Sequence, residues 1–246
     1  MDSLQVSVVI PVFNEELVLH EFYPRLKKEA ESWGKSYELL FVDDGSTDNS
    51  FELICKWKKI DSSIRVVKFT RNFGQQAAVL AGFRESRGNI VVQIDSDLQN
   101  PPEEIKRLLG AFTDEVDLVV TIPRKRRDSV LRILGSKVLH SLAQALFGNR
   151  FKLNLSSFRA MRRSVLEKID QCQDRSRYMA VLMSWMAVPT VHVEVDHHLR
   201  KMGQTKYGVL PLLRLTWDLI TGYSNFPLRL VTYLGLLGAE IGRAHV

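Results

Sequence analysis

The sequence predicts an α/β protein whose mostly parallel central sheet is flanked by helices on both faces. Two observations lead to this fold class. In the first half of the chain, short apolar runs alternate with longer segments that carry helix signals. These apolar runs are near-continuous, as is typical of strands buried on both faces of a parallel sheet. A chain of 246 residues is long enough to bury a core as one large domain or two small ones.

Each predicted element follows from a local signal. The β-branched run VSVVIPV predicts the first strand, and an amphipathic segment predicts the helix after it. After the second strand Gly45 makes a turn, and Ser46, Thr47 or Asp48 can cap the next helix, which ends near residue 60. The predicted strands are 6–12, 37–42, 64–69, 90–94 and 116–121, and the helices around them include 15–33 and 74–86.

A double proline after the fourth strand predicts another helix start. In NPPEE, Asn100 can be the N-cap, Pro101 the first helical residue and Glu103 the third. Residues 128–147 predict a helix with a leucine face. Residues 208–230 predict an interfacial, amphipathic segment, because aromatic side chains are interspersed in an apolar stretch.

The composition is that of an ordinary globular protein, with 45% hydrophobic and 25% charged residues. Two isolated cysteines, Cys55 and Cys172, are too few for a disulfide framework or a zinc site, so a reducing compartment is expected. The N-terminus lacks the basic and apolar regions of an export signal.

The net charge of +6 requires an explanation. Basic runs lie at 124–127 and 159–163, and such runs suit anionic lipid headgroups or phosphorylated substrates. A solvated surface is the alternative. Nucleic acid ranks last as a partner, because the basic runs lack the interleaved aromatic residues of a stacking platform.

Acidic residues follow three of the predicted strands. Glu15 follows the first, Asp43 and Asp44 the second, and Asp95 and Asp97 the fourth. In parallel sheets ligands bind beyond the carboxyl ends of the strands. The predicted topology therefore gathers three acidic corners into one crevice, and this convergence is stronger evidence for a site than any single motif.

Asp95 and Asp97 have two interpretations. Two carboxylates spaced one residue apart after a strand can bind Mg²⁺ or Mn²⁺, with Gln99 as a further oxygen ligand. Alternatively, Asp97 or Asn100 only caps the helix that follows, and Asp95 is solvated. An Asp-x-Asp pair alone favours the cap, whereas its position beside other acidic strand ends favours the metal.

The stretch DDGSTD predicts a nucleotide contact. Asp43 or Asp44 could accept hydrogen bonds from a base or ribose. A simple capped turn explains Gly45 and Ser46, but it does not explain two adjacent acids at the end of an apolar strand. The chain contains neither of the glycine-rich phosphate-binding motifs, so a bound diphosphate would need a metal to neutralise it.

Two further stretches carry candidate residues. In RNFGQQAAVLAGF, small residues predict a helix face that packs closely on the sheet, and Arg71 and Asn72 are candidate contacts. In LRKMGQTKYG, Arg200 and Lys206 lie around a glycine turn and suit phosphate oxygens, unless the loop is simply a solvated basic loop.

These stretches occur together in one order: SVVIPVFNEE, FVDDGSTDNS, RNFGQQAAVLAGF, DSDLQNPPEEI and RKMGQTKYG. As a set they resemble the family-2 glycosyltransferases that attach a sugar to a polyprenyl phosphate. That group includes dolichol-phosphate mannose synthases, bactoprenol glucosyltransferases and undecaprenyl-phosphate 4-deoxy-4-formamido-L-arabinose transferases. The resemblance covers about residues 5–230 and is closest to the last subgroup.

The resemblance implies a GT-A fold and a role for each matching residue. A nucleotide-sugar, a divalent Mg²⁺ or Mn²⁺ and a polyprenyl phosphate would be the ligands. The implied nucleotide contacts are Pro11, Phe13, Glu15 and Asp43; the implied metal ligands are Asp95, Asp97 and Gln99; the implied phosphate contacts are Arg124, Arg200 and Lys206.

Two positions depart from the family pattern. The family usually has Tyr where this chain has Phe13, so a hydroxyl is lost while stacking is retained. Members also carry an Asp shortly before the Phe158-Arg159 pair, proposed as a base, where this chain offers Asn154, Ser156 and Ser157. A phosphate acceptor tolerates this loss, because its second pKa near 6 leaves it largely dianionic at neutral pH.

The resulting prediction is an inverting, metal-dependent transfer of a sugar, from a UDP-linked donor, to a polyprenyl phosphate at the cytoplasmic face of a bacterial inner membrane. The alternatives are a saccharide hydroxyl acceptor or a non-catalytic nucleotide-sugar-binding subunit; homo-oligomer formation is left open. The predicted domains are a GT-A domain over 1–207, an amphipathic juxtamembrane segment over 208–230, and the truncated start of a membrane region over 231–246 with GRAHV as a foreign tail.

Overall fold

A computed structural model describes residues 4–124, 156–172, 179, 182–183, 188–196, 221 and 226–244. The chain divides into two compact units. The first unit comprises Met1–Arg127, Asn154–Gln173 and Met186–Gly203, and the second comprises Asp128–Leu153, Asp174–Trp185 and Gln204–Val246.

The first unit is built on a seven-stranded sheet with the order β3-β2-β1-β4-β6-β5-β7 within the described residues. Neighbouring strands are parallel except where β6 pairs antiparallel with β4 and β5. The predicted mostly parallel sheet is therefore confirmed. The strands are β1 Val6–Val12, β2 Tyr37–Asp43, β3 Ile64–Lys68, β4 Ile90–Gln93, β5 Leu118–Pro123, β6 Arg159–Arg162 and β7 Thr190–Val195.

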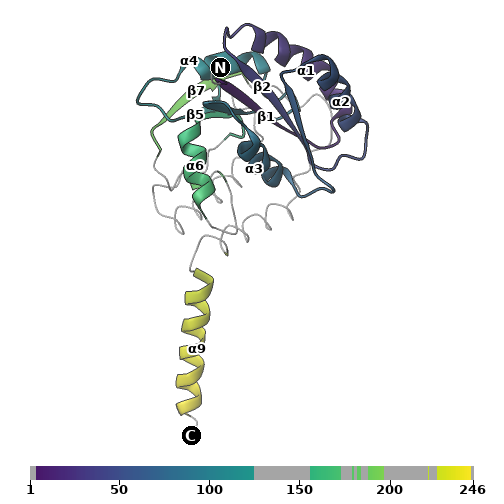
Figure 1. Cartoon of the computed structure of the whole chain (residues 1–246). Coiled ribbons are helices and arrows are strands. Elements are labelled where there is room, and N and C mark those ends of the chain that lie inside the picture. Colours follow the sequence, from purple (N-terminus) through teal and green to yellow (C-terminus); the bar gives the residue numbers. More distant parts are fainter. Residues whose placement is uncertain are drawn as a thin grey trace. The chain divides into compact units, whose positions relative to one another are not determined.

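Helices cover both faces of this sheet (Figure 1). The chain moves outward from β1 to β3 and then crosses back to β4, so right-handed connections place α1 and α2 on one face and α3 on the other. Accordingly α1 contacts α2, and α3 contacts α6. The helices are α1 Glu16–Glu31, α2 Ser50–Ile60, α3 Gln75–Glu85, the 3₁₀ turn η1 Pro102–Glu104, α4 Ile105–Gly110 and α6 Arg163–Gln171.

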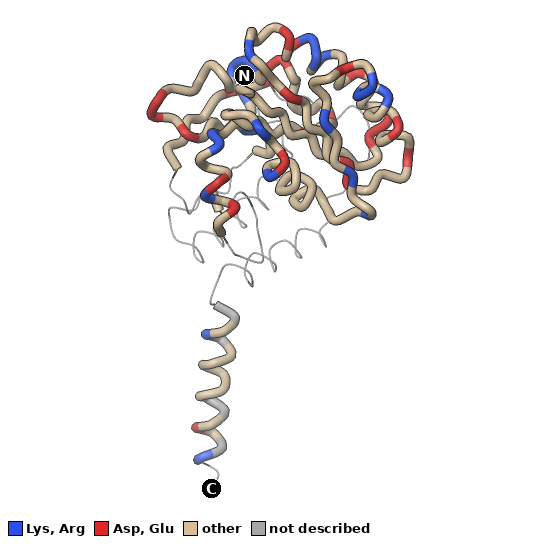
Figure 2. The backbone as a smooth tube through the Cα atoms, in the orientation of Figure 1, with Lys and Arg blue, Asp and Glu red and all other residues tan. Residues whose placement is uncertain are grey.

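The centre of the sheet is fully buried. All seven residues of β1 are buried, and β1 lies between β2 and β4 with Val6 aligned to both Tyr37 and Ile90. This register brings the carboxyl ends of β1, β2 and β4 to the same edge. Outside the sheet, Lys, Arg, Asp and Glu alternate along the exposed sides of α1 and α2 (Figure 2).

The small residues of α3 pack directly on the sheet, as the sequence predicts. Ala78 and Gly82 are buried, and a Cβ atom on Gly82 would lie 2.3 Å from Val9 Cγ1. No side chain larger than hydrogen fits there without moving β1. The close approach of α3 fixes the position of its first residue, Gln75, relative to the strand ends.

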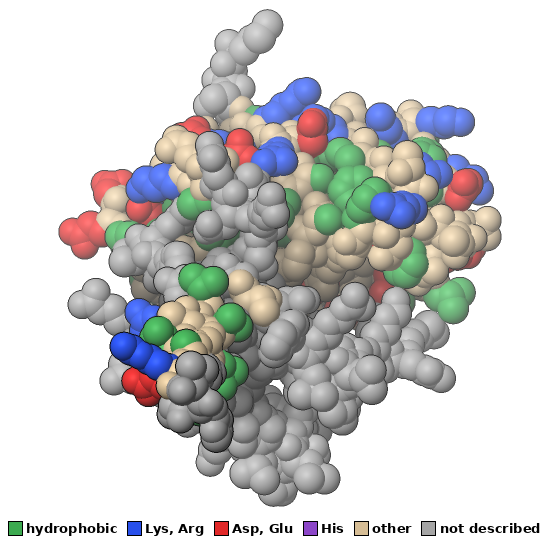
Figure 3. Space-filling view, turned by 90° about the horizontal axis from the view of Figure 1, so that it is seen from below, with side chains coloured by type: hydrophobic (Ala, Val, Ile, Leu, Met, Phe, Trp, Pro, Cys, Tyr) green, Lys and Arg blue, Asp and Glu red, His purple; other side chains and the backbone are tan. Residues whose placement is uncertain are grey.

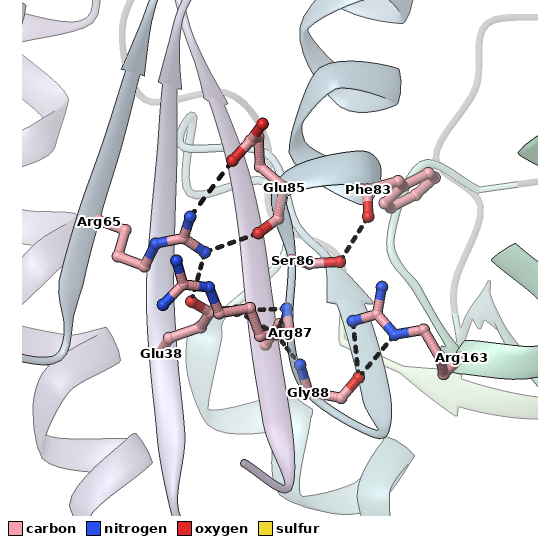
Figure 4. Close-up of polar contacts among 9 residues, drawn as sticks. Glu38, Arg65, Phe83, Glu85, Ser86, Arg87, Gly88 and Arg163 are labelled. Carbon is pink, nitrogen blue, oxygen red and sulfur yellow. Dashed lines mark hydrogen bonds and ion pairs between the residues drawn. The ribbon is translucent and has the colours of Figure 1, made fainter. Parts of the chain in front are cut away.

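A polar network joins the amino ends of the strands, opposite the edge with the acidic corners (Figure 4). Buried Glu38 accepts hydrogen bonds from Ser7 Oγ at 2.6 Å, the Arg87 backbone N–H at 2.7 Å and Arg65 Nη1 at 2.9 Å. The Arg163 guanidinium donates twice to the Gly88 carbonyl. Five separate segments are thus tied together at this edge.

One sequence interpretation is wrong. Asn100 is not the helix cap: Pro101 occupies the N-cap of a 3₁₀ turn that leads into α4, and Pro102 begins that turn. The extended conformation that precedes a proline moves the start by one residue. Within the basic run 159–163, the first arginine is no part of a solvated surface. Buried Arg159 donates to Gln93 Oε1 at 2.9 Å.

In the second unit the structure describes α9, Phe226–Ala244. The side chains described for α9 are exposed, among them Leu228, Val231 and Leu234, and exposed hydrophobic side chains are visible in Figure 3. No helix among the described residues combines the length and apolarity that crossing a membrane requires. The predicted helix 128–147 and most of the segment 208–230 lie outside the described residues.

Candidate functional site

Hydrogen bonds connect the loop after β1 to the loop after β2 at the carboxyl edge of the sheet. Asn14 adopts a positive φ of 55°; its backbone N–H donates to Ser46 Oγ at 3.1 Å, and its Oδ1 accepts from the Thr47 N–H at 2.8 Å. Glu15 is partly buried, and its N–H donates to Ser50 Oγ at 3.0 Å. The first two of the three predicted acidic corners are therefore joined by hydrogen bonds between their loops. Pro11 is buried and Phe13 is partly exposed at its margin.

Asp43 is a fully buried carboxylate with an unused acceptor. Its Oδ2 accepts the Ser46 N–H at 3.3 Å. Its Oδ1 is buried and, within the described part of the chain, has no hydrogen-bond partner. An unsatisfied buried acceptor costs roughly 1–3 kcal/mol. Such an atom beside a solvent-facing loop is suited to accept an N–H from a ligand.

Asp44 is arranged differently from its neighbour. Its Oδ1 accepts the Phe73 N–H at 2.7 Å, and its Oδ2 accepts the Gly74 N–H at 2.9 Å. Both carboxylate oxygens thus hold the loop that leads into α3. The sequence grouped Asp44 with Asp43 as a nucleotide contact, whereas the geometry gives Asp44 a loop-holding contact.

Gly45 lets the same loop approach the β2 corner. Its φ is +70°, and a Cβ atom would lie 2.5 Å from the Arg71 carbonyl carbon and 2.8 Å from the Asn72 nitrogen. These are backbone atoms, so they cannot rotate away. Arg71 and Asn72 are both exposed, and the Arg71 guanidinium lies over the Phe73 ring at 4.8 Å.

Asp95 receives two short hydrogen bonds from distant segments. Gln75 Nε2 donates to Oδ1 at 2.6 Å, and Ser157 Oγ donates to Oδ2 at 2.6 Å. Burial raises the pKa of Asp95, the hydrogen bond from Ser157 lowers it, and the charge of Asp97 raises it again; the net shift is upward. The carboxylate therefore lies where added positive charge would stabilise it.

Asp97 lies in a tight turn just beyond Asp95. Its Oδ1 accepts the Gln99 N–H at 3.1 Å. Between them, Leu98 adopts a positive φ of 59° while its side chain is buried. A non-glycine residue in this region is strained, and here the buried side chain holds the turn. The turn thereby presents Asp97 beside Asp95.

The predicted phosphate contacts are only partly described. Arg124 is exposed, and its Nη1 donates to Asp196 Oδ1 at 3.1 Å. Arg200, Lys206 and Asn154 lie outside the described residues. The roles of all candidate residues remain predictions, but the convergence of Glu15, Asp43 and the Asp95–Asp97 pair at one edge is confirmed by the parallel register.

The residues at Asp95 and Asp97 fit a divalent cation. The donors are oxygens, which Mg²⁺ and Mn²⁺ prefer, and both side chains are partly exposed. The two hydrogen bonds to Asp95 come from a neutral amide and a neutral hydroxyl, so they leave its negative charge in place. Among the described residues, no group of three or more His, Cys, Asp or Glu side chains could hold a metal by itself.

Gln75 and Ser157 were not predicted as site residues. Gln75 lies in a stretch that the sequence explains by helix packing, and Ser157 was noted only because it is not a carboxylate. Their partner is far away in sequence, at separations of 20 and 62 residues. Gln75 lies six residues after the predicted strand 64–69, and Ser157 lies beside no predicted strand, so no local pattern marks either residue.

Comparisons with known proteins support these findings. The sequence model described as glycosyl transferase family 2 matches residues 7–170. The undecaprenyl-phosphate 4-deoxy-4-formamido-L-arabinose transferase of Aeromonas hydrophila is 40% identical over 98% of this chain and 74% of its own length. That of Shewanella sediminis is 39% identical over 94% of this chain and 70% of its own.

One solved structure shows the same fold. Glucosyl-3-phosphoglycerate synthase from Mycobacterium tuberculosis, crystallised with Mn²⁺, UDP-glucose and phosphoglyceric acid, matches with a TM-score of 0.64 and 21% identity. The match covers 88% of this chain and 77% of that chain. The predicted GT-A fold is confirmed.

Proposed function

The chain belongs to glycosyl transferase family 2, and we propose that it transfers a sugar from a UDP-linked donor to a polyprenyl phosphate. The observation that carries this proposal is buried Asp43 Oδ1, which has no partner among the described residues and lies at the same sheet edge as the Asp95–Asp97 pair. Asp43 Oδ1 suits a nucleobase, and the Asp95–Asp97 pair suits a diphosphate. The parallel sheet brings the two together.

Asp43 is proposed to select the base. Uracil carries an N–H donor at its N3 position, whereas cytosine has an acceptor there. A carboxylate oxygen that lacks a donor pairs with the first and repels the second. The relative crystallised with UDP-glucose is consistent with a uridine donor.

We propose that the diphosphate of the donor lies beside Asp95, Asp97 and Gln99. A bound Mg²⁺ or Mn²⁺ would supply the positive charge that stabilises the departing nucleoside diphosphate. The protein contributes the fixed positions of the two carboxylates, through the turn at Leu98 and the hydrogen bonds to Asp95. Arg124, Arg200 and Lys206 are proposed to hold donor and acceptor phosphates.

A phosphate acceptor explains the chemistry of this site best. Its oxygen is already largely deprotonated at neutral pH, so little is gained from a general base. In the described part of the segment before Phe158, Ser156 accepts the Phe158 N–H and Ser157 donates to Asp95; neither is a carboxylate. Direct attack by the acceptor phosphate would invert the anomeric centre.

The named relatives suggest the first substrates to test. Two are transferases of 4-deoxy-4-formamido-L-arabinose to undecaprenyl phosphate. We therefore take this sugar, linked to UDP, as the first candidate donor and undecaprenyl phosphate as the first acceptor. Such an acceptor lies in a membrane, and the exposed apolar residues Leu228, Val231 and Leu234 of α9 support a location at the cytoplasmic membrane face.

A nucleotide-binding experiment tests the donor assignment. Isothermal titration with UDP, GDP and CDP in Mn²⁺ is expected to show UDP binding at least about tenfold tighter than CDP, because cytosine leaves Asp43 Oδ1 facing another acceptor. In Asp43→Asn the Ser46 N–H keeps the amide oxygen on its own side. The amide NH₂ then replaces Oδ1, so the preference should shift toward CDP.

Asp114→Asn, on an exposed loop, serves as the control and should leave the ratio unchanged. Equal binding of UDP and CDP by the unmodified protein, or an unchanged ratio in Asp43→Asn, would contradict the assignment. Product analysis separates the alternative functions. A glycosylated saccharide would indicate a hydroxyl acceptor, and normal donor binding without turnover on any acceptor would indicate a non-catalytic subunit.

A further inference from the structure

Asp95 is held by two side chains that come from opposite directions in the sequence. Gln75 is the first residue of α3, and Ser157 lies just before β6. Each donates to a different carboxylate oxygen at 2.6 Å. A carboxylate offers about four acceptor positions, so these two bonds leave one position on each oxygen. The carboxylate plane is thereby fixed, with one acceptor position of each oxygen still available to a ligand.

The nature of the two donors matters as much as their geometry. An amide and a hydroxyl orient the carboxylate without neutralising it, whereas a lysine or arginine in either place would compete with a cation for its charge. The arrangement matches what a metal-binding carboxylate needs, namely a fixed orientation and a retained negative charge.

Gln75 is itself held in place from the nucleotide corner. Asp44 accepts the N–H groups of Phe73 and Gly74, the two residues directly before Gln75. The backbone at Gly74 has a φ of +94° and forms the N-cap of α3. The carboxylate next to Asp43 therefore fixes the turn from which Gln75 reaches Asp95.

We propose that Gln75 and Ser157 are positioning residues that orient the Asp95 carboxylate for the divalent cation of the donor complex. This inference rests on the proposed function. Gln75 additionally connects the base-binding corner to the metal-binding corner through the turn that Asp44 holds. Neither residue touches the reacting atoms; both act through Asp95.

The test is a direct measurement of metal binding. Titrating Mn²⁺ into the full chain with saturating UDP, and following the free Mn²⁺ signal by electron paramagnetic resonance, gives the Mn²⁺ dissociation constant. Gln75→Ala and Ser157→Ala are each expected to weaken Mn²⁺ binding by roughly 10- to 100-fold, as is usual when a partner of a metal ligand is removed. Binding of UDP without metal should stay the same.

The chain offers matched controls for both variants. Ser156→Ala removes a hydroxyl one residue away that accepts the Phe158 N–H and does not contact Asp95. Arg84→Ala removes an exposed side chain at the other end of α3, whose ion pair with Asp170 is solvent-exposed. Both should bind Mn²⁺ like the unmodified chain, and Ser157→Thr, which keeps the hydroxyl, should restore most of the affinity.

Gln75 is exposed, so Gln75→Ala keeps the test decisive even if Ser157→Ala does not fold. Unchanged Mn²⁺ affinity in a folded Gln75→Ala protein, while the unmodified chain binds Mn²⁺ and UDP, would overturn the inference and leave the proposed function standing. An unmodified chain that binds neither Mn²⁺ nor UDP would remove both together.

Discussion

At the scale of single residues, Asp61 shows how a buried charge is stabilised outside the candidate site. It accepts hydrogen bonds from Tyr23 Oη at 2.8 Å, Lys27 Nζ at 2.7 Å and Ser63 Oγ at 2.6 Å. Burial alone would raise the pKa of Asp61, but the bonds from Lys27, Ser63 and Tyr23 outweigh it and lower the pKa from 3.8 to about 2. The charged form is therefore favoured in the folded state.

This shift predicts how stability depends on pH. Because the folded pKa is lowered, the contribution of Asp61 is fully present above pH ~4 and is lost as the pH falls toward about 2. Asp61→Asn should reduce the free energy of unfolding by roughly 2 kcal/mol at pH 7, and the difference should shrink between pH ~4 and ~2. Urea unfolding across this range measures it.

Glu31→Gln provides the comparison, since Glu31 is exposed and lies 3.8 Å from the same Lys27 Nζ. Its effect should stay below about 1 kcal/mol. A constant difference between the Asp61→Asn and unmodified proteins down to pH 2 would show that the substitution acts through packing and not through charge.

A second residue-scale prediction concerns Gly45. Gly45→Ala would place a Cβ atom 2.5 Å from the Arg71 backbone at a φ of +70°, so the loop before α3 must move. We expect a lower melting temperature and weaker UDP binding. Gly34→Ala is a matched control, because Gly34 has a φ of +61° but no atom of the described residues within 4 Å of its Cβ position.

Gly34→Ala should therefore lose only the roughly 1–2 kcal/mol of left-handed strain, without any effect on UDP binding. If the two alanine variants behave alike, the close approach of the 71–72 backbone to Gly45 is not what restricts this position. Differential scanning fluorimetry with and without UDP separates the outcomes.

The positions of the site carboxylates could be predicted from the sequence, but their hydrogen-bond partners could not. The positions of Asp43, Asp95 and Asp97 follow from apolar runs that end in carboxylates. The difference between Asp43, with an open Oδ1, and Asp44, with both oxygens bonded, does not follow, because it depends on a loop 29 residues further along. Ser157 reaches Asp95 across 62 residues, and local patterns carry no information about such pairs.

At the scale of elements, the predicted strands at 6–12, 37–42, 64–69 and 90–94 match β1 to β4 to within one residue at each end. The apolar runs of β1, β2 and β4 are buried almost throughout, so hydrophobicity alone reveals them, whereas the edge strand β3 is only partly buried. β6 was not predicted. Its four residues RAMR include a buried arginine that pairs with Gln93, contrary to the usual preference of arginine for the surface.

β7 was not predicted either, in this case because it is exposed. It is the last strand in the sheet order, and most of its residues are exposed, so its sequence TVHVEV has no buried apolar run. An edge strand is defined by pairing with its neighbour, here β5, more than by its own composition. Pairing of this kind comes from tertiary structure.

The polar network at the amino edge leads to an element-scale prediction. Glu38→Ala removes the acceptor shared by Ser7, Arg65 and the Arg87 N–H, and leaves Arg65 without its buried partner. A loss of about 3 kcal/mol or more in the free energy of unfolding is expected. Glu85→Ala removes the other, exposed partner of the same Arg65 and should cost less than about 1 kcal/mol.

Equilibrium urea denaturation of both variants measures the two losses. Similarly small losses in the free energy of unfolding for both variants would mean that Glu38 contributes little to joining the strands at the amino edge. UDP binding at the opposite edge should be unaffected by Glu85→Ala.

At the scale of the whole first unit, the two edges of one sheet have different chemistry. At the amino edge, Glu38 is paired with donors from several segments. At the carboxyl edge, Asp43 Oδ1 has no partner among the described residues, and Asp95 is oriented without being neutralised. A parallel sheet produces this division because all its carboxyl ends collect on one side. The amino edge therefore stabilises the sheet, and we propose that the carboxyl edge carries out the sugar transfer.

An assay of sugar transfer to the lipid phosphate tests the proposed reaction itself. The chain is incubated with Mn²⁺, undecaprenyl phosphate and UDP-linked 4-deoxy-4-formamido-L-arabinose, and the lipid product is identified by mass spectrometry. The account predicts a glycosyl phospholipid with the unmodified chain, and a loss of about 100-fold or more with EDTA or with Asp97→Asn. Transfer that continues undiminished in Asp97→Asn, or a protein that binds the donor yet glycosylates no lipid phosphate, would contradict it.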